Sequence, residues 1–151
     1  MTARHAVVLL AVCAWACDSG ANTLGGSLST FHDLGFATVR ARLYSSELAM
    51  EYVRENQEVA LRVSLRRSAV EPESGLVADL ATQGDVTGST QRTPLPPLTA
   101  GTLRLARFEA REGASVRGHF DARFEAGLTE VGLHGDFDMP LTIVHSPGSS
   151  P

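Results

Sequence analysis

The sequence contains no lysine, because all thirteen of its basic residues are arginine. Any mechanism that depends on a catalytic lysine is therefore excluded. Cysteine is scarce as well, and Cys13 and Cys17 are the only two. Long apolar segments are missing, since the longest run has about eleven residues and would cover about 16 Å as a helix, half of a hydrocarbon core of about 30 Å. We expect no transmembrane helix.

Familiar catalytic motifs are missing too. The sequence has no Gly-x-Ser-x-Gly elbow, no lysine-containing phosphate loop, no dinucleotide fingerprint and no His-Glu-x-x-His helix. Thirteen basic against seventeen acidic side chains give a formal net charge of −4, which disfavours nucleic acid as a partner. We therefore expect a protein that is not an enzyme and that carries no cofactor.

The first seventeen residues have the layout of an export signal. A basic start, an apolar stretch and a small-residue cleavage site follow one another, formed by Arg4 and His5, by residues 6–12 and by Ala14-Trp15-Ala16. With Cys17 directly after this site, the segment resembles the lipobox of bacterial lipoproteins, although Ala14 stands where that family prefers Leu and Trp15 is bulkier than usual. The resemblance implies a signal peptide over residues 1–16 and a lipid on Cys17.

A second outcome remains open at the same bond. Ala14-Trp15-Ala16 is also an ordinary A-x-A site, so a general signal peptidase would leave Cys17 unmodified and the protein secreted or periplasmic. Either cleavage removes Cys13, which excludes an intramolecular disulfide, and leaves twelve basic against seventeen acidic side chains. We expect a protein of the bacterial cell envelope that meets the membrane through its N-terminal lipid. Asp18 resembles an inner-membrane retention signal of enteric bacteria, and the choice between inner and outer membrane stays open.

The remaining chain divides by composition. Residues 17–26 are small and polar and predict a flexible tether, residues 27–145 predict a single domain, and residues 146–151 predict a disordered tail. Alternating apolar and polar residues predict half-buried strands over residues 37–44, 59–66 and 102–110.

Two stretches of the domain are less regular. For residues 46–55 we favour a short helix on composition, although Leu48, Met50 and Tyr52 also alternate as in a strand. Residues 71–75 and 83–100 predict loops, the second long enough for a short strand around Val86.

A near-repeat predicts a hairpin close to the C-terminus. Residues 116–122 read Val-Arg-Gly-His-Phe-Asp-Ala, and seventeen residues later 133–139 read Leu-His-Gly-Asp-Phe-Asp-Met. Closing the hairpin with Phe124 opposite Val131 places the apolar residues of both strands on one face. On the other face it pairs Arg117 with Asp138, His119 with Asp136 and Asp121 with His134. This register places Phe120 opposite Gly135. Glycines within the two strands predict that a neighbouring backbone or a large aromatic ring comes close.

The outer face of this hairpin carries the best candidates for chemistry. His119, Asp121, His134 and Asp136 cluster there, and imidazole with carboxylate suits a divalent metal such as zinc. Opposed side chains on a flat strand surface point the same way, which favours polar pairs over a closed metal cage. We therefore expect pairing and no metal, with zinc binding as the alternative.

The body of the chain also resembles small β-rich lipoproteins of Gram-negative bacteria, which end in strands of the form apolar-x-Gly-x-Phe. The resemblance covers residues 101–141 and, more weakly, 26–66. It implies an all-β fold, an antiparallel β-sandwich or partly open barrel with a C-terminal hairpin, and supplies no activity. We expect a lipid-anchored envelope protein whose β-domain is a binding or structural module. The alternatives are a metal-binding envelope protein and a small secreted enzyme whose pocket joins residues such as His32 and His145.

Overall fold

The computed structural model describes residues 22–70, 75–90 and 92–145. The predicted signal peptide, Cys17, most of the tether and the tail over residues 146–151 lie outside these ranges. Within them the chain forms ten strands, one short helix and two 3-10 helices. Their bounds are β1 Thr23–Gly25, η1 Ser27–Thr30, β2 Thr38–Leu43, β3 Glu47–Val53, β4 Val59–Arg66, η2 Arg67–Ala69, β5 Leu76–Asp79, α1 Leu80–Gln83, β6 Gly84–Thr90, β7 Thr93–Pro94, β8 Leu98–Arg107, β9 Ser115–Ala126 and β10 Thr129–Ile143.

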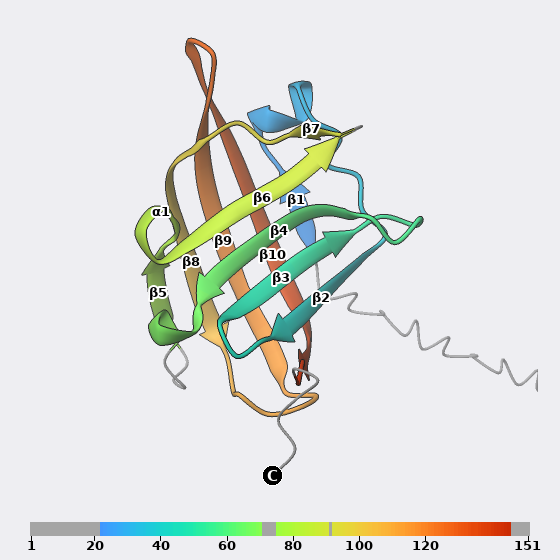
Figure 1. The fold of residues 1–151 in the computed structure, drawn as a ribbon, viewed down its shortest axis with the longest axis vertical. Helices are drawn as coiled ribbons and strands as arrows, with labels where there is room; N and C mark the ends of the chain where they lie inside the picture. Colours follow the sequence, from blue (N-terminus) through green and yellow to red (C-terminus); the bar gives the residue numbers. More distant parts are fainter. Residues whose placement is uncertain (1–21, 71–74, 91, 146–151) are drawn as a thin grey trace, which may run out of the picture.

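The strands make one curled, mixed sheet that forms a half-barrel (Figure 1). Its order is β5-β8-β9-β10-β2-β3-β4-β6-β7, and β1 pairs with β10 outside this path. The long strand β10 joins the two halves: β9 lies along one side of it, while β1 and β2 share the other. In Figure 1, β3, β4 and β6 cross in front of β8, β9 and β10. The predicted all-β fold is confirmed, and the β10–β2 pair is parallel where we expected antiparallel strands.

The core fills the space between the two halves. It is made of fully buried aliphatic and aromatic side chains from both, the largest being Tyr52, Phe120, Phe124, Phe137, Leu48, Met50, Leu61 and Leu103. The Tyr52 hydroxyl crosses the core from β3 and donates a hydrogen bond to the Asp136 carbonyl oxygen on β10, at 3.0 Å. Burial, with a smaller contribution from the Asp136 charge, raises the pKa of this phenol.

The register of the C-terminal hairpin is confirmed. Phe124 pairs with Val131, Phe120 with Gly135 and His119 with Asp136. This register turns the apolar residues of both strands into the core, where Phe120 and Phe124 are fully buried. Shifting either strand by one residue would expose them, which is why the pattern determines the register.

The close approach at the strand glycines is also confirmed. A Cβ on Gly118 would overlap the carbonyl oxygen of Arg104 on β8 and lie 2.6 Å from the Phe137 ring. A Cβ on Gly135 would lie 2.6 Å from the Phe120 ring and 2.8 Å from the Tyr52 hydroxyl. Each glycine therefore makes room for an aromatic side chain at the point where the core is densest.

The helix favoured for residues 46–55 is wrong, because Glu47–Val53 forms β3. This strand pairs with β2 on one side and β4 on the other, and all but its first residue are buried. Backbone pairing on both edges outweighs the local helix preference of this stretch. The loop expected over residues 83–100 contains β6, which confirms the alternative of a strand around Val86. Residues Thr23–Gly25 of the expected tether form β1.

Candidate functional site

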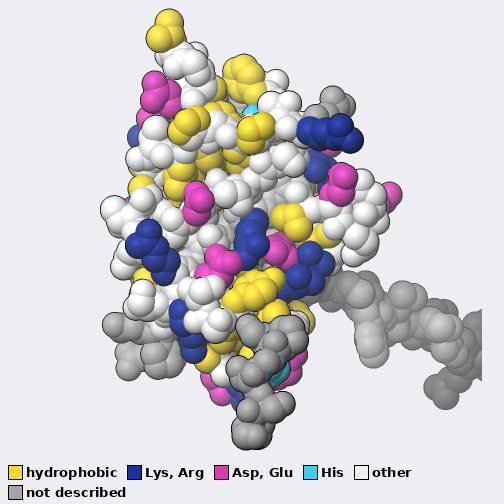
Figure 2. All heavy atoms as spheres, viewed as in Figure 1, with side chains coloured by type: hydrophobic (Ala, Val, Ile, Leu, Met, Phe, Trp, Pro, Cys, Tyr) yellow, Lys and Arg dark blue, Asp and Glu magenta, His cyan; other side chains and the backbone are white. Residues whose placement is uncertain are grey.

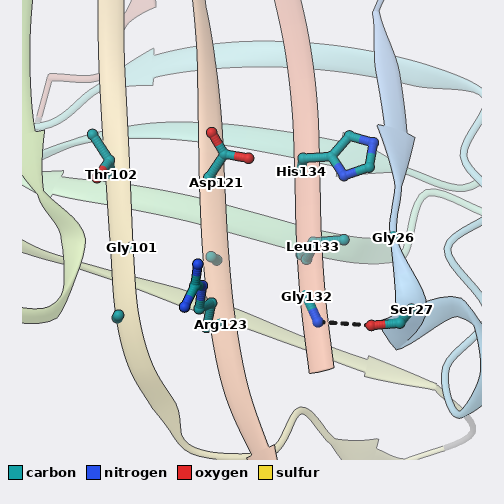
Figure 3. Close-up of a pocket in the computed structure, with 11 residues that line it drawn as sticks. Gly26, Ser27, Gly101, Thr102, Asp121, Arg123, Gly132, Leu133 and His134 are labelled. Carbon is teal, nitrogen blue, oxygen red and sulfur yellow. Dashed lines mark hydrogen bonds between the residues drawn. The ribbon is translucent and has the colours of Figure 1, made fainter. Parts of the chain in front are cut away.

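The outer surface of β8, β9, β10 and β1 forms an exposed polar face. Successive side chains of a strand point to opposite sides, so the residues between the buried ones are directed into solvent. One row across the strands consists of Thr102, Asp121 and His134, which Figure 3 shows side by side. The next row contains Arg104, His119 and Asp136.

His119 lies between two carboxylates on this face. Its Nδ1 is 3.0 Å from Asp136 Oδ1, and its Nε2 is 2.8 Å from Asp121 Oδ2. Partial burial lowers the pKa of the imidazole, but the hydrogen bonds and charges of Asp121 and Asp136 together outweigh it and raise the pKa above the ordinary value. With both ring nitrogens donating, the arrangement favours an imidazolium held between two anions.

Asp136 connects this pair to the N-terminal strand. The Thr23 hydroxyl donates to Asp136 Oδ2 at 2.9 Å. This hydrogen bond lowers the pKa of the Asp136 carboxyl, partial burial opposes it, and His119 lowers the pKa further. Three strands, β1, β10 and β9, are therefore tied by one chain of polar contacts through Thr23, Asp136 and His119.

His134 does not join the other three predicted residues. Figure 3 shows its ring turned toward β1, and a Cβ on Gly25 would lie 3.4 Å from its Nε2. In the ranges that the structure describes, no group of three or more His, Cys, Asp or Glu side chains is placed to hold a metal ion. Asp121 lies opposite His134 as predicted, but its carboxylate contacts His119 in place of His134.

A shallow open groove lies beside this network, with a volume of about 560 Å³ (Figure 3). It is hollow because small residues such as Ala100 and Gly132 occupy the outward positions of its floor. Polar groups surround the floor: the Asp121 carboxylate, the Arg123 guanidinium and the His134 imidazole. The groove therefore offers both signs of charge to a small polar ligand.

Side chains of the N-terminal segment close the free edge of β10 next to this groove. Backbone amides of β10 donate to Asn22 Oδ1, Thr23 Oγ1 and Ser27 Oγ, at 2.7, 3.1 and 2.9 Å, from Asp138, Asp136 and Gly132 respectively. Without this segment an unpaired stretch of β10 would be open to another strand. Residues 22–27 are therefore a structural part of the domain.

A second polar cluster, which the sequence reasoning missed, lies on the outer surface of β2, β3 and β4. Glu51 on β3 is 2.6 Å from Arg40 Nε, and the guanidinium groups of Arg42 and Arg62 lie 3.8 Å from its carboxylate. We call these four residues the buried charge cluster, because the Glu51 side chain is only 4% exposed. Positive and negative side chains are mixed on this part of the surface in Figure 2. Treating residues 46–55 as a helix hid the cross-strand pairing of Glu51 with Arg40 and Arg62.

The residues named for an enzymatic alternative are not brought together. His32 follows η1, which lies next to Gly132 near the start of β10, and His145 follows the other end of that strand. Asp33 is 3.9 Å from Arg54, with which it forms an ion pair. Neither His32 nor His145 lines the groove on the polar face.

Comparison of the chain with protein-family models, with curated proteins and with solved structures found no match. Among the described residues, none of the helices has the length and apolar composition to cross a membrane. The fold and the polar face define a small all-β half-barrel protein.

Proposed function

We propose that the chain is a lipid-anchored protein of the bacterial cell envelope, with Cys17 as the lipidated residue and the half-barrel as a binding module. One observation carries the anchoring. The first described strand, β1, begins at Thr23, six residues after Cys17. Cleavage before Cys17 would therefore leave every described strand in place, so the export signal and the folded body do not compete for residues.

The anchor would hold the body close to the bilayer. Asn22 is five residue steps after Cys17, and an extended chain covers at most about 3.6 Å per step, so the reach is about 18 Å. Asn22 is itself bonded to β10, so this reach is an upper limit on the distance from Cys17 to the described body. We call this connection the leash; it would keep the attached domain close to the bilayer.

The groove on the exposed polar face supports the binding role. It offers a guanidinium, a carboxylate and an imidazole around a floor of small residues, which suits a small polar ligand. The body carries more acidic than basic side chains, so nucleic acid remains disfavoured.

Mass spectrometry of the mature protein tests the anchor. We expect the chain to begin at Cys17, to carry a diacylglyceryl adduct and to enter the detergent phase on partitioning, because two acyl chains hold a protein to a membrane firmly. Cys17→Ser should abolish the adduct and leave the protein in the aqueous phase. Cys13→Ser is the matched control and should behave as wild type. A mature chain that keeps residues 1–16, or wild-type protein released without detergent, would contradict the proposal.

A further inference from the structure

One end of the half-barrel exposes apolar side chains. Leu128, in the turn between β9 and β10, is fully exposed, and Phe31, just after η1, is 61% exposed. They are two of three exposed large hydrophobic residues in the described ranges, and the third, Val77, lies on the edge strand β5. Figure 2 shows hydrophobic side chains gathered over the upper part of the molecule, where Figure 1 places the β9–β10 turn and η1.

Three segments build this end. The Glu125 amide donates to the Pro97 carbonyl oxygen at 3.1 Å, which holds the segment before β8 against β9. On the other side of the hairpin, η1 is held to β10 by the bond between Ser27 and Gly132. We call the surface that these segments share the apolar end; its residues are Phe31, Leu95, Leu98, Ala126 and Leu128, of which Leu95, Leu98 and Ala126 are partly buried.

The fold does not require leucine at position 128. Gly127 and Leu128 form the two-residue turn. The φ of 67° at Gly127 suits glycine, whereas the Leu128 side chain is fully exposed and contributes nothing to the core. A polar residue would serve the turn equally well and would avoid exposing an apolar side chain to water. Apolar side chains gathered at one end of a fold, as in the upper part of Figure 2, are typical of interaction sites.

Two carboxylates flank the same turn. Glu125 and Glu130 are direct cross-strand partners and both are exposed. Like charges opposite each other destabilise a sheet, and among the described basic side chains Arg123 forms an ion pair with Glu130, at 3.5 Å. The pair therefore weakens the isolated hairpin slightly, while it would be favourable against a basic surface.

The short connection from Cys17 to Asn22 limits how the apolar end can be oriented toward the bilayer, and this step rests on the proposed lipid anchor. Asn22 lies beside Asp138, ten residues along β10 from Leu128, or about 33 Å at 3.3 Å per residue. The leash reaches about 18 Å. With β10 upright on the bilayer, the apolar end therefore cannot reach the acyl chains that hold Cys17.

We propose that the apolar end is a docking surface for a protein partner that presents an apolar pocket rimmed by arginine or lysine side chains. Leu128 and Phe31 would fill the pocket, and Glu125 and Glu130 would face the rim. The carboxylates disfavour an anionic bilayer as the occupant, and with β10 upright the leash would hold this end away from the bilayer.

Photo-crosslinking with the full-length chain in the cells that produce it tests the proposal. Phe31→p-benzoylphenylalanine places a probe on the apolar end with little change in shape, and Val77→p-benzoylphenylalanine is the matched control at the distant exposed hydrophobic position. We expect one identified protein adduct from position 31 and none of the same mass from position 77. Adding Leu128→Ser, or Glu125→Gln with Glu130→Gln, should lower the adduct yield at least tenfold, while adding Val77→Ser should not change it.

The purified partner then completes the test. Its crosslinked peptide should map to an apolar pocket bordered by basic residues, and its affinity for the purified protein should fall at least tenfold with Leu128→Ser. An adduct with a second copy of this chain, an adduct of lipid mass, equal adducts from positions 31 and 77, or no adduct would each overturn the proposal. The mass of the mature N-terminus, measured on the same sample, reports separately on the anchor.

Discussion

The exposed polar face and the buried charge cluster both lie on the outer surface of one curled sheet, yet their charged side chains differ in exposure to water. On the polar face, the side chains of His119, Asp121 and Asp136 are 39%, 67% and 55% exposed. In the cluster, the Glu51 side chain is 4% exposed and faces three arginines. Water therefore screens the first network strongly and is nearly excluded from the carboxylate of the second.

The difference comes from the side chains next to each network. Arg40, Arg42 and Arg62 lie on the two strands that flank β3, and their aliphatic stems cover it. Next to Glu51 on the outer face of β3 is Ala49, which is small and fully buried. Arg62 also stacks over the Tyr44 ring, 5.5 Å from its centre. The charged side chains of the polar face lie beside an open groove, so they stay in contact with water and remain available to a ligand.

The largest effect is expected beneath the polar face. Gly118→Ala should lower the free energy of unfolding by about 3 kcal/mol, because the new Cβ would overlap the Arg104 carbonyl oxygen and press on Phe137. Urea unfolding followed by fluorescence or circular dichroism measures this change. The matched control is Gly132→Ala in the same hairpin, where the nearest atom to the new Cβ is Ser27 Oγ at 4.0 Å, and we expect a change below about 1 kcal/mol. Equal losses for the two variants would show that the aromatic contacts are not the cause.

The second effect tests the buried charge cluster. Glu51→Ala should cost about 2 kcal/mol, because it removes the carboxylate that three guanidinium groups share; the arginines are about one-third exposed, which limits the loss. Glu47→Ala, on the same strand but with a side chain 31% exposed, is the control and should cost below about 1 kcal/mol. If the Glu47 variant proved the less stable of the two, the contrast between buried and screened charge would fail.

The smallest effect concerns the exposed network and pH. The pKa of His119 is raised, so its contribution to stability is complete below the unfolded value of about 6.5 and is lost as the pH rises through the higher folded value. The pKa of Asp136 is lowered, so its contribution is complete above about 3.9 and is lost as the pH falls through the lower folded value. The network therefore contributes most between about pH 4 and 6.5.

Melting temperatures at pH 5.5 and pH 8 measure this dependence. His119→Gln should remove a stabilisation of about 0.5 kcal/mol at pH 5.5 and change little at pH 8. His145→Gln, at a residue outside the network, should keep the wild-type profile. A His119 variant that loses the same stability at both pH values would indicate a packing role in place of the charge.

The hairpin and the charge cluster show how far sequence reasoning reached. The register of β9 and β10 was predictable because both strands carry strict alternation and complementary charges, so one pairing satisfies both faces at once. The pairing of His119 with Asp136 was predicted from this register. The orientation of the His134 ring toward β1 was not, because it depends on where residues 23–25 lie. Thr23 was missed as a hydrogen-bond donor to Asp136 for the same reason, because the composition of its segment predicted a tether.

The sequence by itself determined the all-β class, the inward and outward faces of the strands and the pairing of the C-terminal hairpin, because these depend on residue spacing and on near neighbours along the chain. Only the tertiary structure decided that β10 joins β2 in parallel, that β1 closes the edge of β10 and that residues 47–53 form a strand covered on both faces. Those features come from contacts between distant segments. Their free energy exceeds the local conformational preferences that a sequence pattern records.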